Sequence, residues 1–204
     1  MEFFSAIFLF ALSTSITPGP NNIMIMTSGL NHGVKFSLPH LLGICFGFPI
    51  MVILVGLGIG VFFEMYPMLH EIIKIFGILY LLYLSWLIAA SSPTSLDGGI
   101  SNPLSFIQAA LFQWVNPKAW VMAAGAVSAY TTVSTDIFIQ VLYIALAFFV
   151  VSFPSVGVWL VFGAGLKKYL KSPKHQKVFN VSMAILLVGS VLPVVKEFVD
   201  KYTA

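Results

Sequence analysis

The sequence indicates an all-α integral membrane protein, because its composition, its long apolar stretches and a repeated pattern of helix breaks agree. Of the 204 residues, 59% are hydrophobic and 8% are charged, whereas about 25% of the residues in a soluble protein are charged. So few polar residues cannot make a surface that faces water. We therefore expect lipid to be the solvent of this chain.

Six apolar stretches approach or exceed the roughly 20 residues that a helix needs to cross a bilayer. Each is expected to be a helix, because backbone polar groups cannot remain unpaired in lipid and no stretch alternates like a barrel strand. Short connectors favour one transmembrane domain (1–204) with repeat one at 1–91, a cytoplasmic connector at 92–103 and repeat two at 104–204. The stretches are 3–30, 36–63, 72–90, 104–130, 137–166 and 178–195.

The lysines predict how these spans are oriented. The connectors after spans 1, 3 and 5 hold Lys35 and the five lysines between Lys167 and Lys177, against a single acid, Asp97. Cytoplasmic loops carry an excess of lysine, so we expect this side in the cytoplasm and both termini outside. An anionic-lipid site at the same lysines is the alternative interpretation.

Matching features recur in the same order in the two halves, at offsets of 99, 105 and 103 residues. Since each half has an odd number of spans, the second half must be inverted relative to the first. Inverted repeats with broken helices in corresponding positions are typical of transporters, with the site near the bilayer midplane. The matches are Pro18 with Pro117, Phe48-Pro49 with Phe153-Pro154, and the openings Lys74-Ile75-Phe76-Gly77 and Lys177-Val178-Phe179-Asn180.

Spans 1 and 4 are expected to break at mid-membrane. Proline inside a helix removes an amide donor and clashes with the preceding turn, and Thr17-Pro18 and Asn116-Pro117 also fit an N-cap residue followed by proline. A restarting half-helix would favour a substrate carboxylate at its amides, and the carbonyls before it an ammonium; ordinary proline kinks are the alternative. The candidate substrate-binding residues are Thr17, Pro18, Gly19, Pro20, Asn21, Asn116, Pro117 and Lys118.

Two titratable side chains are candidates for a proton relay. Lys118 is the one charge deep within a span, roughly 18–20 Å from either end, and a buried ammonium is costly enough to suggest a function. It would attract a carboxylate or carry a proton, unless span 4 is shorter, with Gln113 near the interface. His40, beside Pro39, is the second candidate, with an interfacial histidine as the alternative.

The chain resembles the LysE/RhtB family of bacterial amino-acid exporters over its whole length. The resemblance rests on Thr17-Pro18-Gly19-Pro20-Asn21, on Gly33, Gly43 and Gly47, and on Asn116-Pro117-Lys118. It implies a multi-pass protein of the bacterial inner membrane that exports an amino acid or derivative and is driven by the proton motive force. A homodimer is left open.

We expect a secondary exporter of a small, neutral amino acid or derivative, with the substrate and membrane lipids as partners. A second positive charge on the substrate would find no carboxylate within the spans. No cofactor, metal or nucleic acid is expected, because the chain lacks nucleotide motifs, arginine and more than one cysteine, Cys45. An intramembrane enzyme and an exporter of a metal or other inorganic ion are the alternatives, and the spans lack the residue pairs that either would need.

Overall fold

The computed structural model describes residues 2–59, 65–90, 102–132, 136–170 and 172–203, whose regular structure is helical throughout. The predicted all-α fold is confirmed. Most of the predicted connector 92–103, including Asp97, and the end of predicted span 2 lie outside these residues. Within the described residues, four helical stretches are long and apolar enough to span a membrane, Pro20–Gly58, Glu71–Ala90, Ile137–Leu166 and Pro173–Pro193, beside the shorter apolar helices Phe4–Ile16 and Phe106–Val115.

The first half of the chain contains a helix break and a tight turn. Helix α1 (Glu2–Ile16) stops before the predicted break, and α2 (Pro20–Leu54) begins after it. Within α2, Gly33 has a φ of 79°, which glycine adopts at little cost and which a regular helix excludes. Gly33 therefore divides α2 into two consecutive helices, where the sequence predicts the boundary between spans 1 and 2. The short π-helix η1 (Val55–Ile59) and α4 (Pro67–Ala90) follow.

The second half begins with a short helix that ends at the second predicted break. Helix α5 (Phe106–Phe112) and the 3-10 turn η3 (Gln113–Val115) precede Asn116, and α6 (Pro117–Tyr130) restarts after it. Helices α7 (Ile137–Leu166) and α8 (Pro173–Thr203) complete the chain. Asp136 caps α7 by accepting from the backbone N–H groups of Phe138 and Ile139.

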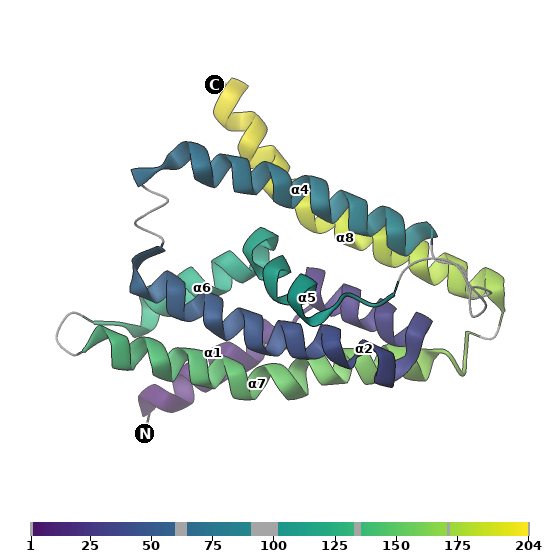
Figure 1. Ribbon diagram of the computed structural model, residues 1–204, viewed down its shortest axis with the longest axis horizontal. Helices are drawn as coiled ribbons and strands as arrows, with labels where there is room; N and C mark the ends of the chain where they lie inside the picture. Colours follow the sequence, from purple (N-terminus) through teal and green to yellow (C-terminus); the bar gives the residue numbers. More distant parts are fainter. Residues whose placement is uncertain (1, 60–64, 91–101, 133–135, 171, 204) are drawn as a thin grey trace.

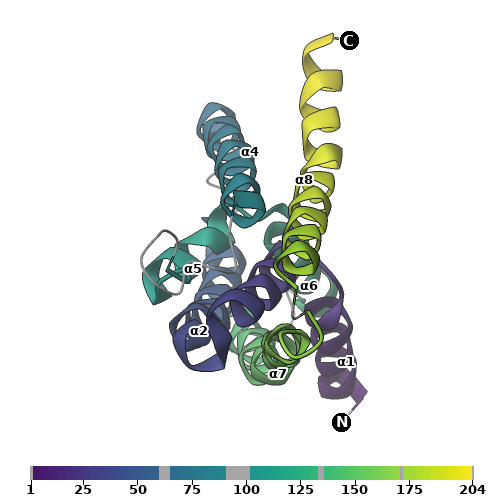
Figure 2. The same ribbon diagram turned by 90° about the vertical axis from the view of Figure 1, so that its right-hand side faces the viewer.

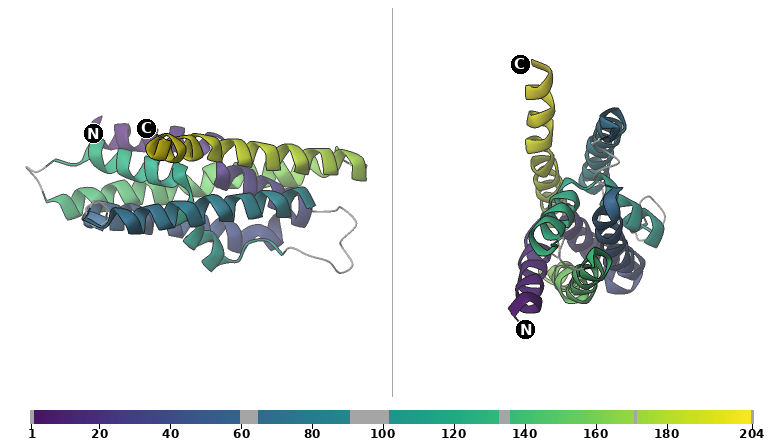
Figure 3. Two further views of the ribbon diagram at one scale, coloured as in Figure 1. Left: turned by 90° about the horizontal axis from the view of Figure 1, so that it is seen from above. Right: turned by 90° about the vertical axis from the view of Figure 1, so that its left-hand side faces the viewer.

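The helices run roughly along one axis, with α4 and α8 side by side above the remaining helices (Figures 1 and 2). The view from above shows the same alignment (Figure 3). The turn within α2, the ends of α4 and α7 and the start of α8 lie at one end of the molecule, while η1, the end of α6 and the start of α7 lie at the other (Figure 1). Lys35 and Lys167 directly follow that turn and α7, so they lie at the first end, which we call the lysine-rich end.

Glycines allow α2 and α7 to touch backbone to backbone. A Cβ added at Gly163 of α7 would collide with the carbonyl oxygen of Met26, and one at Gly29 of α2 would collide with that of Leu160. Gly43 and Gly47 of α2 pack in the same manner against α5. Membrane helices commonly approach each other through such small residues, and here they bring α5, the segment before the second break, against the α2–α7 pair.

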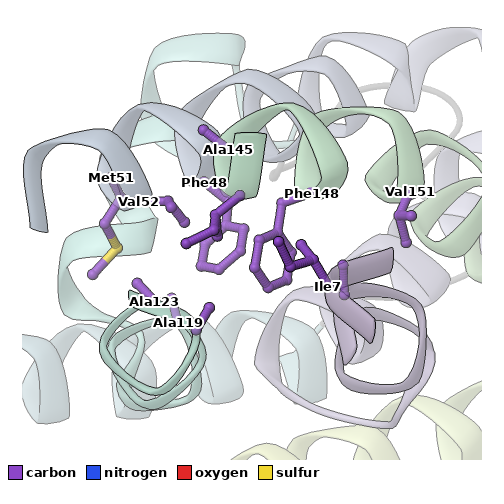
Figure 4. Close-up of a cluster of buried hydrophobic side chains, with 12 residues drawn as sticks. Ile7, Phe48, Met51, Val52, Ala119, Ala123, Ala145, Phe148 and Val151 are labelled. Carbon is purple, nitrogen blue, oxygen red and sulfur yellow. The ribbon is translucent and has the colours of Figure 1, made fainter. Parts of the chain in front are cut away.

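A buried apolar cluster lies next to the breaks and fixes the elements around them. Phe48 of α2 and Phe148 of α7 meet edge to face, with ring centroids 4.9 Å apart, and Ile7 of α1 and Ala119 of α6 join them (Figure 4). Ala119 follows Asn116 by only three residues. The cluster therefore holds α1 and α6 in place beside the second break.

The outer surface is rich in large apolar side chains. Phe36, Trp86 and Val121 are 70%, 64% and 73% exposed. Exposed apolar area of this extent is incompatible with water and is what lipid-facing helices require. The chain is therefore a multi-pass membrane protein.

Candidate binding site at the helix breaks

The first break exposes carbonyl oxygens that an uninterrupted helix would have paired. Asn22 Nδ2 donates to the carbonyl oxygens of Ser15 and Thr17, each at 2.8 Å. Trp159 Nε1, from α7, donates to the carbonyl oxygen of Ile16 at 3.0 Å. The carbonyl end of α1 is therefore a cluster of acceptors that polar side chains occupy, as the principle that buried backbone groups must be paired requires.

The restart of the first break lies two residues later than the sequence predicts. Gly19 is the N-cap and Pro20 the first helical residue, so the assignment of Thr17 as N-cap and Pro18 as first residue is wrong. The Thr17 hydroxyl instead donates to the carbonyl oxygen of Thr14 at 2.8 Å, which ties it to the end of α1. Gly19 offers no side-chain cap, so the first amides of α2 are left without one.

The second break follows the predicted pattern. Asn116 is the N-cap, its Oδ1 accepts from the backbone N–H of Lys118 at 3.1 Å, and Pro117 is the first helical residue. Trp120 Nε1 donates to the carbonyl oxygen of Trp114 at 2.8 Å, and the two rings meet edge to face with centroids 5.8 Å apart. This break therefore satisfies much of its own backbone.

Lys118 joins the two breaks. Its Nζ donates to the carbonyl oxygen of Thr17 at 2.7 Å, to Thr17 Oγ1 at 2.8 Å and to the carbonyl oxygen of Pro18 at 3.3 Å. The ammonium of α6 thus sits at the negative end of the α1 dipole, which favours a cation. The sequence left Lys118 without a partner, and the structure supplies one made of neutral oxygen atoms.

Gly19 makes room for this contact. A Cβ at Gly19 would lie 2.6 Å from Lys118 Cδ and 3.1 Å from its Nζ. The backbone of Gly19 is extended, with φ −179° and ψ 178°, a conformation open to any residue. Glycine here therefore leaves room for the lysine side chain that passes close by, and it relieves no backbone strain.

A pair of amides also connects the breaks, and sequence reasoning missed it. Asn21 Nδ2 donates to Gln113 Oε1 at 2.8 Å, and Gln113 Nε2 donates back to Asn21 Oδ1 at 3.2 Å. Gln113 is fully buried, so this amide pair lies inside the protein. A polar amide in an apolar stretch three residues before Asn116 was the available signal.

These residues surround a small central cavity between α1, α2, α6 and α7. It holds about 30 Å³, counted as space open to the centre of a water molecule, which is room for about two or three waters. Gly19, Asn21, Asn116 and Lys118 from the predicted set line it. Thr17 and Pro18 do not line the cavity themselves but bind Lys118, which does. Pro20 and Pro117 are the first residues of the helices beside it. The full lining is Thr14, Ser15, Gly19, Asn21, Asn22, Ile44, Phe48, Asn116, Lys118, Ala119, Met122, Ser152 and Val156.

His40 lies elsewhere. It is 2% exposed and lines a separate cavity between α2, α4 and the segment that precedes α5. It therefore does not meet Lys118 in this conformation.

A helical membrane protein with broken helices and an interior charge has the architecture of a secondary transporter. The chain belongs to the LysE type translocator family, whose model matches residues 12–194. It is therefore a transporter, and the intramembrane enzyme considered from the sequence is excluded.

Curated relatives support the same assignment. The chain is similar to the cysteine/O-acetylserine efflux proteins of Escherichia coli (strain K12) and Shigella flexneri. Each is 29% identical over 187 residues, which are 90% of this chain and 93% of the relative. No solved structure matches the chain.

Proposed function

We propose that the protein exports a small, neutral amino acid or derivative across the bacterial inner membrane in exchange for protons. The observation that carries this proposal is the seat of the Lys118 ammonium on the oxygens of Thr17 and Pro18. An amino acid carries an ammonium of the same kind. The site therefore already recognises the cationic half of such a substrate.

The first break offers a partner for each charge of a zwitterion. The carbonyl oxygens of Thr17 and Pro18 suit the ammonium. The backbone N–H groups of Asn21 and Asn22, at the uncapped start of α2, suit the carboxylate, because the start of a helix favours anions. Asn116, which also lines the cavity, completes the predicted substrate-binding set from the second break.

Exchange with protons follows from competition between the substrate ammonium and the Lys118 ammonium for the same binding position. Two ammonium groups cannot share the oxygens of Thr17 and Pro18 at close range. A substrate ammonium that binds there displaces Lys118, which releases its proton to the cytoplasm. On the outer side a proton returns to Lys118, and the new ammonium displaces the substrate. His40, in the second cavity, is the other proton-relay candidate.

A neutral substrate fits the charges of the site. Among the described residues that line the central cavity, Lys118 is the only charged one. The second cation of lysine or arginine would therefore be desolvated without a carboxylate partner. The relatives' names specify cysteine and O-acetylserine, which are both small and carry no net charge at neutral pH.

Six spans in two inverted repeats provide the frame for this site. The packing pattern supports it: α1 packs on α7 and α5 packs on α2, so each short broken segment contacts the long helix of the other half. Helices α4 and α8, the third spans of their halves, pair with each other. We place the two breaks near mid-membrane, the lysine-rich end in the cytoplasm and both termini outside.

Inverted membrane vesicles test the proposal, because they present the cytoplasmic side to the medium. An acid-inside gradient should drive uptake of labelled cysteine, O-acetylserine or threonine, and a protonophore should abolish it. Unlabelled neutral amino acids should compete better than equal concentrations of lysine or arginine. Vesicles without the protein give the background. Stronger competition by lysine or arginine, or uptake that ignores the gradient, would contradict the proposal.

A further inference from the structure

A second and larger cavity lies beside the first helix of α2, towards the lysine-rich end. It holds about 80 Å³ on the same measure that gives about 30 Å³ for the central cavity. That volume holds several water-sized groups. Its polar lining is Thr27, Ser28, Asn31, His32, His40 and Asn102, and apolar residues of α2 and α4 complete it.

His40 lines this cavity, and its imidazole has unmet hydrogen-bonding capacity. Neither ring nitrogen has a hydrogen-bond partner among the described residues, although the side chain is 2% exposed. Buried polar atoms without hydrogen-bond partners are rare and unfavourable. A neutral imidazole presents one donor and one acceptor, so the cavity needs an occupant that can both accept from it and donate to it.

The hydroxyl groups around His40 are arranged as acceptors. Thr27 donates its proton to the carbonyl oxygen of Ile23 at 2.8 Å. Ser37 donates to the carbonyl oxygen of Gly33 at 2.9 Å, so the 2.7 Å contact between Ser28 and Ser37 must use the Ser28 proton. The oxygens of Thr27 and Ser28 therefore retain lone pairs for a donor in the cavity.

Asn31 supplies the complementary donor. Its Oδ1 accepts from Asn180 Nδ2 at 3.3 Å, which leaves its Nδ2 to donate. The cavity thus combines acceptors at Thr27 and Ser28 with donors at Asn31, and His40 adds one of each. That set matches an ammonium and a carboxylate on the same small molecule.

We infer that this cavity binds the amino-acid substrate before it reaches the helix breaks, with His40 as a direct ligand. The inference rests on the proposed function. The first helix of α2 runs from the break at Gly19 to the turn at Gly33, so the cavity lies between the lysine-rich end and the central site. Neutral hydrogen-bonding groups, rather than a fixed charge, let the substrate leave again for the central site.

The test compares KM and maximal rate for uptake of a neutral amino acid into inverted vesicles. His40→Leu should raise KM about tenfold, as expected for lost hydrogen bonds, with the maximal rate within about twofold of wild type. His40→Gln or His40→Asn should restore part of the affinity, because an amide also donates and accepts. Thr27→Val, which removes one cavity acceptor together with the Thr27 hydrogen bond to the carbonyl oxygen of Ile23, should raise KM less. His175→Leu, at an exposed histidine of α8, is the matched control.

Two results would overturn the inference. One is a wild-type KM for His40→Leu at normal abundance. The other is a His40→Gln protein with wild-type KM and a collapsed maximal rate, which would assign His40 to proton transfer. If His40→Leu does not accumulate, His40→Gln and Thr27→Val decide in the same way: both should raise KM, and unchanged values refute the site. Wild-type vesicles that take up no amino acid would instead refute the proposed function.

Discussion

Lys118 is held by neutral oxygen atoms rather than by a carboxylate, and this affects how readily it can move. Its closest acceptors are the carbonyl oxygen and hydroxyl of Thr17, at 2.7 and 2.8 Å. Separating a buried ion pair leaves two uncompensated charges and costs several kcal/mol. Separating an ammonium from dipoles leaves only one. The arrangement is therefore suited to a lysine that must give up its seat in every transport cycle.

Substitutions of Lys118 separate the binding role of this seat from its coupling role. In Lys118→Met no ammonium competes for the carbonyls and no proton is carried, so gradient-driven accumulation should fall to background while exchange of labelled for unlabelled substrate remains. Lys118→Arg keeps a permanent cation, so both activities should fall. Vesicle accumulation and counterflow measure the two. Wild-type accumulation by Lys118→Met at normal abundance would disprove the assignment.

Gly19→Ala offers a milder perturbation of the same contact. The added methyl group would crowd Lys118 Cδ without straining an extended backbone, so we expect transport to fall severalfold with normal abundance. Gly125→Ala is the matched control, because its Cβ would meet only the Phe10 ring among the described residues, at an ordinary 3.9 Å.

Local signals predicted the second break correctly and the first break only in part. An asparagine before a proline is an N-cap signature that needs no distant partner, and Asn116 behaves accordingly. The first break offers two prolines, Pro18 and Pro20, and both fit the local rules. Lys118, 101 residues away, occupies the oxygens of Thr17 and Pro18. A contact over such a separation leaves no trace in local sequence, which also explains why the Asn21–Gln113 pair was missed.

At the scale of elements, the α2–α7 contact carries the two broken spans. Gly29 and Gly163 allow the backbones of α2 and α7 to touch, and α5 and α1 pack against these helices. The sequence could not identify α7 as the partner of α2, because a run of small residues favours a close approach of two helices without showing which helix comes close.

Gly163→Ala tests this contact. The new methyl group would collide with the Met26 carbonyl, which belongs to backbone and cannot turn aside, so we expect a loss of about 1–3 kcal/mol of stability. Thermal unfolding in detergent, followed by fluorescence-detected size exclusion, should show a lower midpoint. Gly157→Ala in the same helix, where no atom of the described residues would lie within 4 Å of the added Cβ, should keep the wild-type midpoint. Equal midpoints for the two variants would disprove the proposed contact.

At the scale of the whole molecule, the connections between helices lie at two opposite ends. The lysines predict which connections share an end. The turn within α2, the end of α7 and the start of α8 share one end (Figure 1). Lys177 of α8 donates to the carbonyl oxygen of Ala89 at 2.6 Å, which ties α8 to the end of α4 there. A basic residue at a helix C-terminus also complements the helix dipole.

Cysteine labelling in intact cells tests which end faces the cytoplasm. An impermeant maleimide should label Asp136→Cys directly and label Lys168→Cys only after the membrane is permeabilised, since both positions are exposed and lie at opposite ends. Wild type serves as the blank, because its single cysteine, Cys45, is buried. Direct labelling of Lys168→Cys, without labelling of Asp136→Cys, would reverse the orientation.

The position of Lys118 between the two breaks also affects proton leak through the protein when no substrate is bound. Where two membrane helices are broken, unpaired carbonyl oxygens would bind a chain of water molecules. Such a chain would let protons leak down their gradient. Because Lys118 binds the oxygens of Thr17 and Pro18, the protein's own side chain occupies the break. In the proposed exchange, the substrate-free transporter therefore returns with one proton on Lys118 and without a water path that conducts protons. The proton gradient then drives substrate export and is not lost to leak.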